Sequence, residues 1–287
     1  MSQDDIWQNH PCLNQQAHER VGRIHLPVAP KCNIQCVYCD RRICADLNIQ
    51  HPGWAHKVLS PKEALEFIHE IMEKRADRNG FRGYGFVAGI AGPGDPLANE
   101  ATFETLERIH SEYPNLVKCL STNGLLLEQR LPRMIEVGIS ALTVTVNAMD
   151  WKVGRRIYSW ARFEGKTLRG EEAAKIIIAN QMRGVRAALE AGLALKINTV
   201  LIPGVNDEHV RTLAAYLSKA GVRLMNIMPL IPAGSLKDHR APTLSELHEA
   251  RSECEKIIPQ FWWCQQCSAD VVHFPVNQPE TGGITGE

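Results

Sequence analysis

The sequence predicts an α/β fold built on a partial barrel of parallel strands, and three observations support this. Strand-like and helix-like segments alternate six times along the chain, as in successive β-α units. Several strand-like segments are almost continuously apolar, which is typical of parallel strands buried on both faces. Six units are fewer than the eight of a closed barrel, so we expect an open, TIM-like (β/α)6 barrel.

The predicted strands are short apolar runs that cover 23–29, 83–91, 116–121, 141–148, 195–202 and 223–230. Helices are expected at about 100–112, 132–137, 171–191, 207–220 and 244–258, and a further helix begins after Ser60. There Ser60, Pro61 and Glu63 provide an N-cap, a first-turn proline and a capping-box glutamate. Gly192 and Gly221 are placed to end two of the helices. In such a barrel, functional groups gather at the carboxyl ends of the strands.

Length and charge restrict the classes of protein that fit. The chain has 287 residues, 44% of them hydrophobic, and 32 Lys and Arg balance 32 Asp and Glu. This length suits one barrel domain, and the balanced charge gives no electrostatic case for nucleic acid or an anionic membrane. No apolar run approaches the roughly 18 residues of a membrane span, and the polar N-terminus does not resemble a signal peptide. We expect a cytoplasmic protein that binds neither nucleic acid nor membrane.

Nothing in the composition marks a second domain. We expect the barrel over 23–258, an N-terminal extension over 1–22, and a C-terminal extension over 259–287. The last stretch, 274–287, is rich in Gly, Pro and polar residues and is expected to form a mobile tail.

Cysteine is the strongest chemical signal in the chain. In a reducing compartment, clustered cysteines indicate metal or redox chemistry rather than structural disulfides. An odd number also prevents complete internal pairing. The nine cysteines are Cys12, Cys32, Cys36, Cys39, Cys44, Cys119, Cys254, Cys264 and Cys267.

A C-x3-C-x2-C triplet, Cys32, Cys36 and Cys39, directly follows the first predicted strand. Thiolates are the usual ligands of iron–sulfur clusters. Three cysteines leave one iron of a [4Fe–4S] cluster open, and that iron can chelate the amine and carboxylate of an amino acid. The alternatives are an electron-transfer cluster or a zinc site, although zinc usually takes four protein ligands in two separated pairs.

This triplet, with Tyr38 before its last cysteine and a β/α strand before its first, resembles the radical S-adenosylmethionine (SAM) superfamily. The resemblance implies that the reduced cluster cleaves SAM to a 5′-deoxyadenosyl radical, which takes hydrogen from the substrate. Cys32, Cys36 and Cys39 would then be the catalytic cluster ligands. Tyr38 matches the aromatic position near adenine in that family, and simple core packing is the alternative.

Glycine and polar residues at the later strand ends are candidates for binding SAM. Gly92, Gly94 and Asp95 lie in a Gly-Pro-Gly-Asp segment, where glycine lets the backbone approach a ligand but which is also a good turn. For Asn123-Gly124 both interpretations, a contact with SAM and a simple turn, stay open. The further candidates share positions at or near the ends of the other strands and are Ser121, Asn123, Asn147, Asn198 and Met228.

The other cysteines indicate further metal sites. Cys264 and Cys267 form a C-x2-C pair with no second pair to complete a zinc site, so the missing ligands would come from Cys12, Cys44 or Cys119. Strand alternation puts Cys119 on the face of Ser121, although a buried strand cysteine is commonly a small hydrophobe. Cys254, inside an amphipathic helix, is expected to be structural.

Longer stretches, in register from about residue 10 to 272, resemble the NifB family of radical SAM maturases of the nitrogenase cofactor. The chain looks like the short form without the C-terminal NifX-like domain. The matching stretches are 10–12 (HPC), 28–30 (VAP), 36–39 (CVYC), 89–99 (GIAGPGDPLAN), 120–124 (LSTNG), 196–198 (KIN), 202–209 (IPGVNDEH), 226–230 (NIMPL) and 264–270 (CxxCxAD).

The NifB resemblance implies that two further [4Fe–4S] clusters are substrates. The enzyme would fuse them around a SAM-derived carbide and an added sulfide, giving the eight-iron precursor of the nitrogenase cofactor, as a carbide synthase of lyase or transferase type. Implied partners are an Fe–S cluster donor protein, a sulfide source and downstream carrier or scaffold proteins. The implied ligands are His25, Cys44 and Cys119 for the first cluster and Cys12, Cys264 and Cys267 for the second.

Two positions depart from this pattern. His25 lies near the start of the first predicted strand, and at about 3.3 Å per residue it would sit far below the SAM cluster, so a core histidine is the alternative. Ser268 stands where the family motif has arginine. Two other functions stay open. One is a radical SAM enzyme that acts on a peptide or small molecule, such as a nucleotide. Its extra clusters would be electron carriers that persist through turnover. The other is a non-catalytic Fe–S scaffold, which would need neither the glycine-rich motif nor six β/α units.

Overall fold

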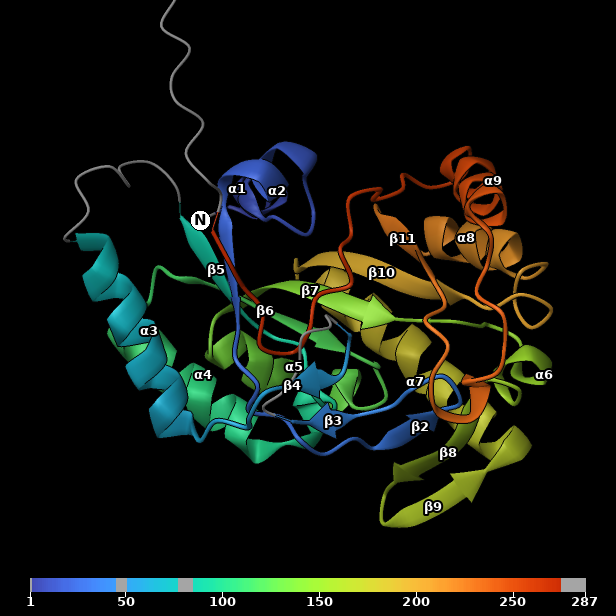
Figure 1. Cartoon of the computed structure of the whole chain (residues 1–287), viewed down its shortest axis with the longest axis horizontal. Coiled ribbons are helices and arrows are strands. Elements are labelled where there is room, and N and C mark those ends of the chain that lie inside the picture. Colours follow the sequence, from blue (N-terminus) through green and yellow to red (C-terminus); the bar gives the residue numbers. More distant parts are fainter. Residues whose placement is uncertain (1, 45–50, 77–84, 275–287) are drawn as a thin grey trace, which may run out of the picture.

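The computed structural model describes residues 2–44, 51–76 and 85–274, and its centre is a seven-stranded sheet in the order β11-β10-β7-β6-β5-β1-β12 (Figure 1). All neighbours from β1 to β11 run parallel, so the predicted partial barrel of six parallel strands is confirmed. The edge strands β11 and β12 do not pair, which leaves the barrel open. The six strands are β1 (Gly22–His25), β5 (Phe86–Ile90), β6 (Val117–Thr122), β7 (Ile139–Thr145), β10 (Ala194–Leu201) and β11 (Met225–Pro229).

Strand β1 ends four residues earlier than predicted, because the chain turns away from the sheet at Pro27, which has no N–H to donate to a ladder. Its last contact with β5 is a hydrogen bond from Leu26 N to Gly89 O, 2.9 Å long. The predicted start of the second strand, 83–84, lies outside the described residues. His25 therefore ends β1 instead of lying near its start.

The helices connect the strands on the outside of the sheet, with α3 and α4 at the left of Figure 1. Helix α5 begins five residues before the predicted 132, because Leu127, Leu131 and Met134 form one buried face that continues past Pro132. Pro132, where the predicted helix began, lies inside the observed helix. The main helices are α3 (Pro61–Ala76), α4 (Glu100–Glu112), α5 (Leu127–Glu136), α7 (Gly170–Glu190), α8 (Val210–Lys219) and α9 (Leu244–Glu255).

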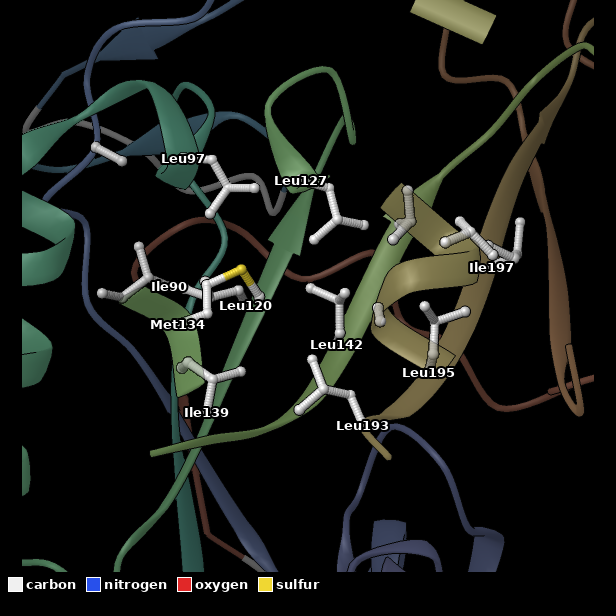
Figure 2. Packing of buried hydrophobic residues seen from close by; sticks show 14 of the residues in the cluster. Ile90, Leu97, Leu120, Leu127, Met134, Ile139, Leu142, Leu193, Leu195 and Ile197 are labelled. Carbon is white, nitrogen blue, oxygen red and sulfur yellow. The ribbon is translucent and has the colours of Figure 1, made fainter. Parts of the chain in front are cut away.

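The two faces of the sheet have different chemistry. Leu120, Leu142 and Leu195 pack into the core shared with the helices (Figure 2). Their strand neighbours Ser121 and Thr143 line a cavity on the other face. This alternation of strand side chains separates the apolar core from the polar interior of the barrel.

Several short elements were not predicted. Strand β2 (Ile34–Cys36) pairs with β8 (Tyr158–Phe163), which forms a hairpin with β9 (Lys166–Arg169). Glu164 and Gly165 have φ of 48° and 74°, as a two-residue hairpin turn requires. The remaining short elements are β3 (Arg42–Ile43), β4 (Trp54–Ala55), α6 (Trp151–Gly154), η1 (Pro96–Ala98) and η2 (Gly234–Leu236).

The two ends of the described chain pack onto the barrel. Helices α1 (Gln3–Asn9) and α2 (Gln15–Arg20) lie at the top of Figure 1, opposite the β2-β8-β9 sheet. Ile6 and Leu13 are buried with Phe261 and with Ala141 and Ala194 of β7 and β10. Strand β12 (Val272–His273) adds antiparallel to β1. The predicted mobile tail falls almost wholly on 275–287, outside the described residues.

None of the helices that the structure describes is both long enough and apolar enough to cross a lipid bilayer.

Candidate functional site

An open cavity lies inside the barrel, and most of the predicted site residues line it. Two of them, Cys44 and Gly92, do not. Cys44 is exposed beside 45–50, and a Cβ on Gly92 would face Ala269 at 3.3 Å. The lining residues among those predicted are Cys12, His25, Cys32, Cys36, Tyr38, Cys39, Gly94, Asp95, Cys119, Ser121, Asn123, Asn147, Asn198, Met228, Cys264 and Cys267.

The cysteine triplet lies on a loop held by its own backbone and by β8. Cys36 ends β2 opposite Tyr158, and Cys39 N donates to Cys36 O at 3.1 Å. The Gln35 side-chain amide donates to the carbonyls of both Cys36 and Cys39, each at 3.0 Å. The loop therefore turns all three thiols toward one cavity, as the spacing predicted.

The environment of these thiols suits a metal cluster. Burial raises the pKa of Cys32 to about 12 and raises the pKa values of Cys36 and Cys39 as well. Buried thiols of this kind stay protonated unless a metal replaces the proton. Two donors approach the sulfurs, Arg41 Nη1 at 3.8 Å from Cys39 Sγ and Asn123 Nδ2 at 3.7 Å from Cys32 Sγ, and such donors also stabilise the sulfurs of a bound cluster.

The glycine-rich segment after β5 supports the backbone that leads into the triplet. Gly94 N donates to Ala29 O at 2.5 Å, and a Cβ on Gly94 would lie only 2.2 Å from Lys31 O. The side-chain amide of Asn99 accepts a hydrogen bond from Lys31 N at 3.2 Å and donates one to Lys31 O at 2.8 Å. Gly94 is thus required for close backbone packing beside Cys32, whatever it contributes to SAM.

The carboxylate of Asp95 accepts hydrogen bonds from neighbouring residues of the protein. Its carboxylate accepts hydrogen bonds from Thr122 Oγ1 at 2.8 Å, Asn123 N at 2.6 Å and Leu97 N at 3.0 Å. Burial raises its pKa to about 6, and these bonds act against the rise. Asp95 therefore holds Asn123 at the cavity wall, and its predicted contact with SAM stays a prediction.

Tyr38 and Asn147 form a polar pair across the cavity wall. Asn147 Nδ2 donates to Tyr38 OH at 2.8 Å, and its Oδ1 accepts from Val200 N at 2.8 Å. Tyr38 also packs against a buried apolar cluster beside Cys36. Both interpretations of Tyr38, core packing and contact with a ligand, are compatible with this position.

Three adjacent strands place His25, Gly89 and Cys119 in one row across the sheet. A Cβ on Gly89 would lie 3.0 Å from Cys119 Sγ and 3.1 Å from His25 Cδ2. A methyl group at Gly89 would therefore crowd both the thiol and the imidazole. Because β1 ends at His25, the row lines the same cavity as the triplet, and the role of His25 as a ligand stays a prediction.

The ring of His25 has a fixed orientation. Nδ1 donates to Ser268 O at 3.0 Å, because a carbonyl can only accept. Burial lowers the pKa of His25, so the neutral ring keeps Nε2 unprotonated. Backbone carbonyls orient metal-binding histidines in the same way. The geometry suits His25 as a ligand, and Ser268 orients its ring through the backbone carbonyl.

The third group of thiols joins the two ends of the chain. Cys12 lies between α1 and α2, and its N–H donates to His10 Nδ1 at 3.1 Å. Cys264 Sγ contacts Met228 Sδ at 3.9 Å. Cys12, Cys264 and Cys267 line the same cavity, so the fold brings together the set that the resemblance implied.

Hydrogen bonds to the carboxylate of Asp270 hold the C-x2-C segment in place. Asp270 accepts from His56 N at 2.7 Å, from His56 Nδ1 at 2.6 Å and from Ser268 Oγ at 2.9 Å. Ala269 N donates to Trp54 O at 2.9 Å. The segment after β3 and β4 therefore fixes Cys267 beside the barrel.

Sequence analysis missed several cavity residues, notably His10, Arg41, His51 and Lys196. Lys196 had a visible signal, a charge inside an apolar strand run. Among the described residues, no group of three or more His, Cys, Asp or Glu converges on a point suited to a single metal ion. Cys254 is fully buried in α9 outside this cavity, as a structural cysteine would be.

Comparison with known proteins places this site in a class. The model of the radical SAM superfamily matches residues 26–217, and the chain belongs to that superfamily. The chain is 44% identical over 263 residues to the FeMo cofactor biosynthesis protein NifB of Methanocaldococcus jannaschii, covering 92% of this chain and 85% of that protein. It is 40% identical to the protein of the same name from Klebsiella pneumoniae, covering 92% and 56%. Within the superfamily, the chain belongs to the NifB family.

Solved structures give weaker matches. The structure titled anSMEcpe with bound AdoMet is 18% identical, with a TM-score of 0.49, covering 74% of this chain and 51% of that one. Methylornithine synthase is 16% identical, with a TM-score of 0.47, covering 85% and 64%.

Proposed function

We propose that this protein makes the eight-iron precursor of the nitrogenase cofactor by fusing two [4Fe–4S] clusters with a SAM-derived carbide and a sulfide. The main support is that one cavity is lined by the cysteine triplet, by His25 and Cys119, and by Cys12, Cys264 and Cys267. Membership of the NifB family supports the role in cofactor assembly. The electron and sulfide donors, and the carriers that receive the product, would be separate proteins.

In this proposal Cys32, Cys36 and Cys39 hold the resident cluster, which leaves one iron for SAM. When bound, the cluster and SAM supply the methyl group and the hydrogen-abstracting radical. Arg41 and Asn123 would stabilise the ligand sulfurs. Tyr38, Gly94, Ser121, Asn147, Asn198 and Met228 are the proposed wall of the SAM pocket, with Asp95 supporting it and Gly92 behind it.

The substrate clusters would use the other ligand groups. His25, Cys119 and Cys44 would bind the first, although Cys44 is exposed and does not line the cavity. Cys12, Cys264 and Cys267 would bind the second. Incomplete or dispersed protein ligation suits a cluster that has to leave, because few bonds then oppose its release.

The test is anaerobic reconstitution followed by iron counting and reaction with dithionite and SAM. We expect about twelve irons per chain, three cubes of four, and release of both 5′-deoxyadenosine and S-adenosylhomocysteine. Cluster iron should leave with the product during turnover. Four irons and no S-adenosylhomocysteine would overturn the proposal, and clusters that persist while a peptide or small molecule is modified would favour the auxiliary-cluster alternative.

A further inference from the structure

Lys196 is a buried cation on the cavity face of β10. Its side chain is 2% exposed and lines the cavity. The ammonium lies 4.6 Å from the ring centroid of Phe261, and within the described part of the chain no carboxylate or carbonyl accepts a hydrogen bond from it. A buried ammonium is costly unless an anion pairs with it. The site is therefore built for an anionic ligand.

No other charged side chain among the described cavity residues provides an anionic partner for Lys196. Asp95 is the one carboxylate among the described lining residues, and its oxygens are taken by Thr122, Asn123 and Leu97. The cation Arg41 is engaged elsewhere, with Gln35 Oε1 at 2.9 Å and the sulfur of Cys39. Lys196 is therefore left without a counter-charge among the residues that the structure describes.

His10 is a second, independent donor without a partner. Its Nδ1 accepts a hydrogen bond from Cys12 N at 3.1 Å, so the ring carries its proton on Nε2. That nitrogen is buried with no hydrogen-bond partner among the described residues, and His10 is 3% exposed. Like Lys196, it lines the cavity.

Lys196 lies in the same cavity as thiols of both proposed substrate sites. On one side it pairs in register with Thr143, which pairs with Ser121, two residues from Cys119. On the other side its ammonium lies 4.6 Å from the ring of Phe261, which shares a buried cluster with Leu13, the chain neighbour of Cys12. Cys119 and Cys12 belong to different proposed clusters. Two anionic clusters held side by side repel each other, and an ammonium between them offsets that repulsion in a low-dielectric interior.

We infer, resting on the proposed function, that Lys196 is a positioning residue that lets two anionic substrate clusters occupy adjacent sites, with His10 Nε2–H as a second donor to their sulfides. The ligand class is an anionic iron–sulfide surface. The interaction is non-covalent, so it needs no additional reactant.

The test compares Lys196→Met with Lys196→Arg after anaerobic reconstitution with iron and sulfide. We expect about twelve irons per chain in the wild type and in the arginine variant, and about eight in the methionine variant. SAM binding should persist in all three. The reduced wild type should show EPR broadening from neighbouring clusters, and Lys196→Met should lose it.

Lys118→Met is the matched control, because Lys118 is also a buried strand lysine. It is 1% exposed, but its Nζ donates to Leu116 O at 3.0 Å and it does not line the cavity. It should keep about twelve irons. In a Cys119→Ser background, where one substrate cluster is already missing, Lys196→Met should cause no further loss.

Full loading and unchanged EPR in Lys196→Met would overturn the inference while leaving the proposed function intact. An equal loss of iron in Lys118→Met, or a further loss of iron in the Cys119→Ser background, would also overturn it.

If the Lys196→Met variant does not fold, His10→Asn and His10→Gln replace it. Asparagine keeps an acceptor for Cys12 N but withdraws the Nε2 donor, and it should lose iron that glutamine retains. Four irons in the wild type would overturn the proposed function and this inference together.

Discussion

The cysteine triplet and the other proposed ligand groups are built in opposite ways. Cys32, Cys36 and Cys39 lie on eight consecutive residues, held by Gln35 and by strand pairing with β8. The other proposed ligands that line the cavity come from the α1–α2 connection, β1, β6 and the C-terminal segment. A local loop suits a resident cluster, because its ligands stay together. Dispersed ligands depend on the packing of distant segments and suit a cargo that must depart.

The largest effect is expected for Cys36→Ala. Loss of one of three cluster ligands should reduce 5′-deoxyadenosine formation to background and lower iron by about four per chain. Chromatography of the reaction with dithionite and SAM measures the first effect, and iron counting the second. Cys254→Ala, a buried cysteine outside the cavity, is the control and should cleave SAM like the wild type. Normal SAM cleavage in Cys36→Ala would break the contrast between resident and substrate sites.

The next effect is expected for Cys12→Ser and Cys264→Ser. Each should remove about four irons and abolish precursor formation while leaving SAM binding intact, because these thiols belong to chain segments outside the triplet loop. Equilibrium SAM binding and iron counting on the same sample measure both. Loss of SAM binding would show that the two groups of cysteines do not act separately.

Gly89→Ala tests the row of β1, β5 and β6. The added methyl would lie 3.0 Å from Cys119 Sγ and 3.1 Å from His25 Cδ2, and such overpacking costs about 1–3 kcal/mol. We expect a lower thermal midpoint and partial loss of iron from the first substrate site. Gly85→Ala is the control, because nothing lies within 4 Å of its added Cβ. Equal iron in both variants would argue against a ligand pair at this row.

The smallest effect is expected for Asp270→Ala, which removes the hydrogen bonds from His56 and Ser268 to the Asp270 carboxylate. Each lost hydrogen bond contributes about 1 kcal/mol, so denaturant unfolding should show a modest loss of stability. Iron at the Cys264–Cys267 site should fall about twofold, a loss of roughly 0.4 kcal/mol in binding free energy, and SAM cleavage should not change. The exposed Asp238→Ala serves as control. An unchanged iron content would mean that the C-x2-C segment needs no anchor beyond β12.

Part of this architecture was predictable from local patterns. The six apolar runs predicted the six parallel strands, and alternation put Cys119 and Ser121 on the cavity side. The β2-β8-β9 sheet and β12 were not predictable, because their short strands form only against distant partners. Helix α5 was predicted too short because its buried face, and not Pro132, sets where it begins.

The sequence by itself determined the cysteine loop, because three ligands within eight residues need no long-range contact to meet. It also determined the polar inner face of the barrel, through the two-residue period of the strands. Only the tertiary structure decided that His25 faces Cys119 across Gly89, that Cys12 and Cys264 line one cavity, and that Lys196 has no counter-ion among the described residues. Strand register and the docking of both chain ends set these relations, and neither is encoded in any single local segment.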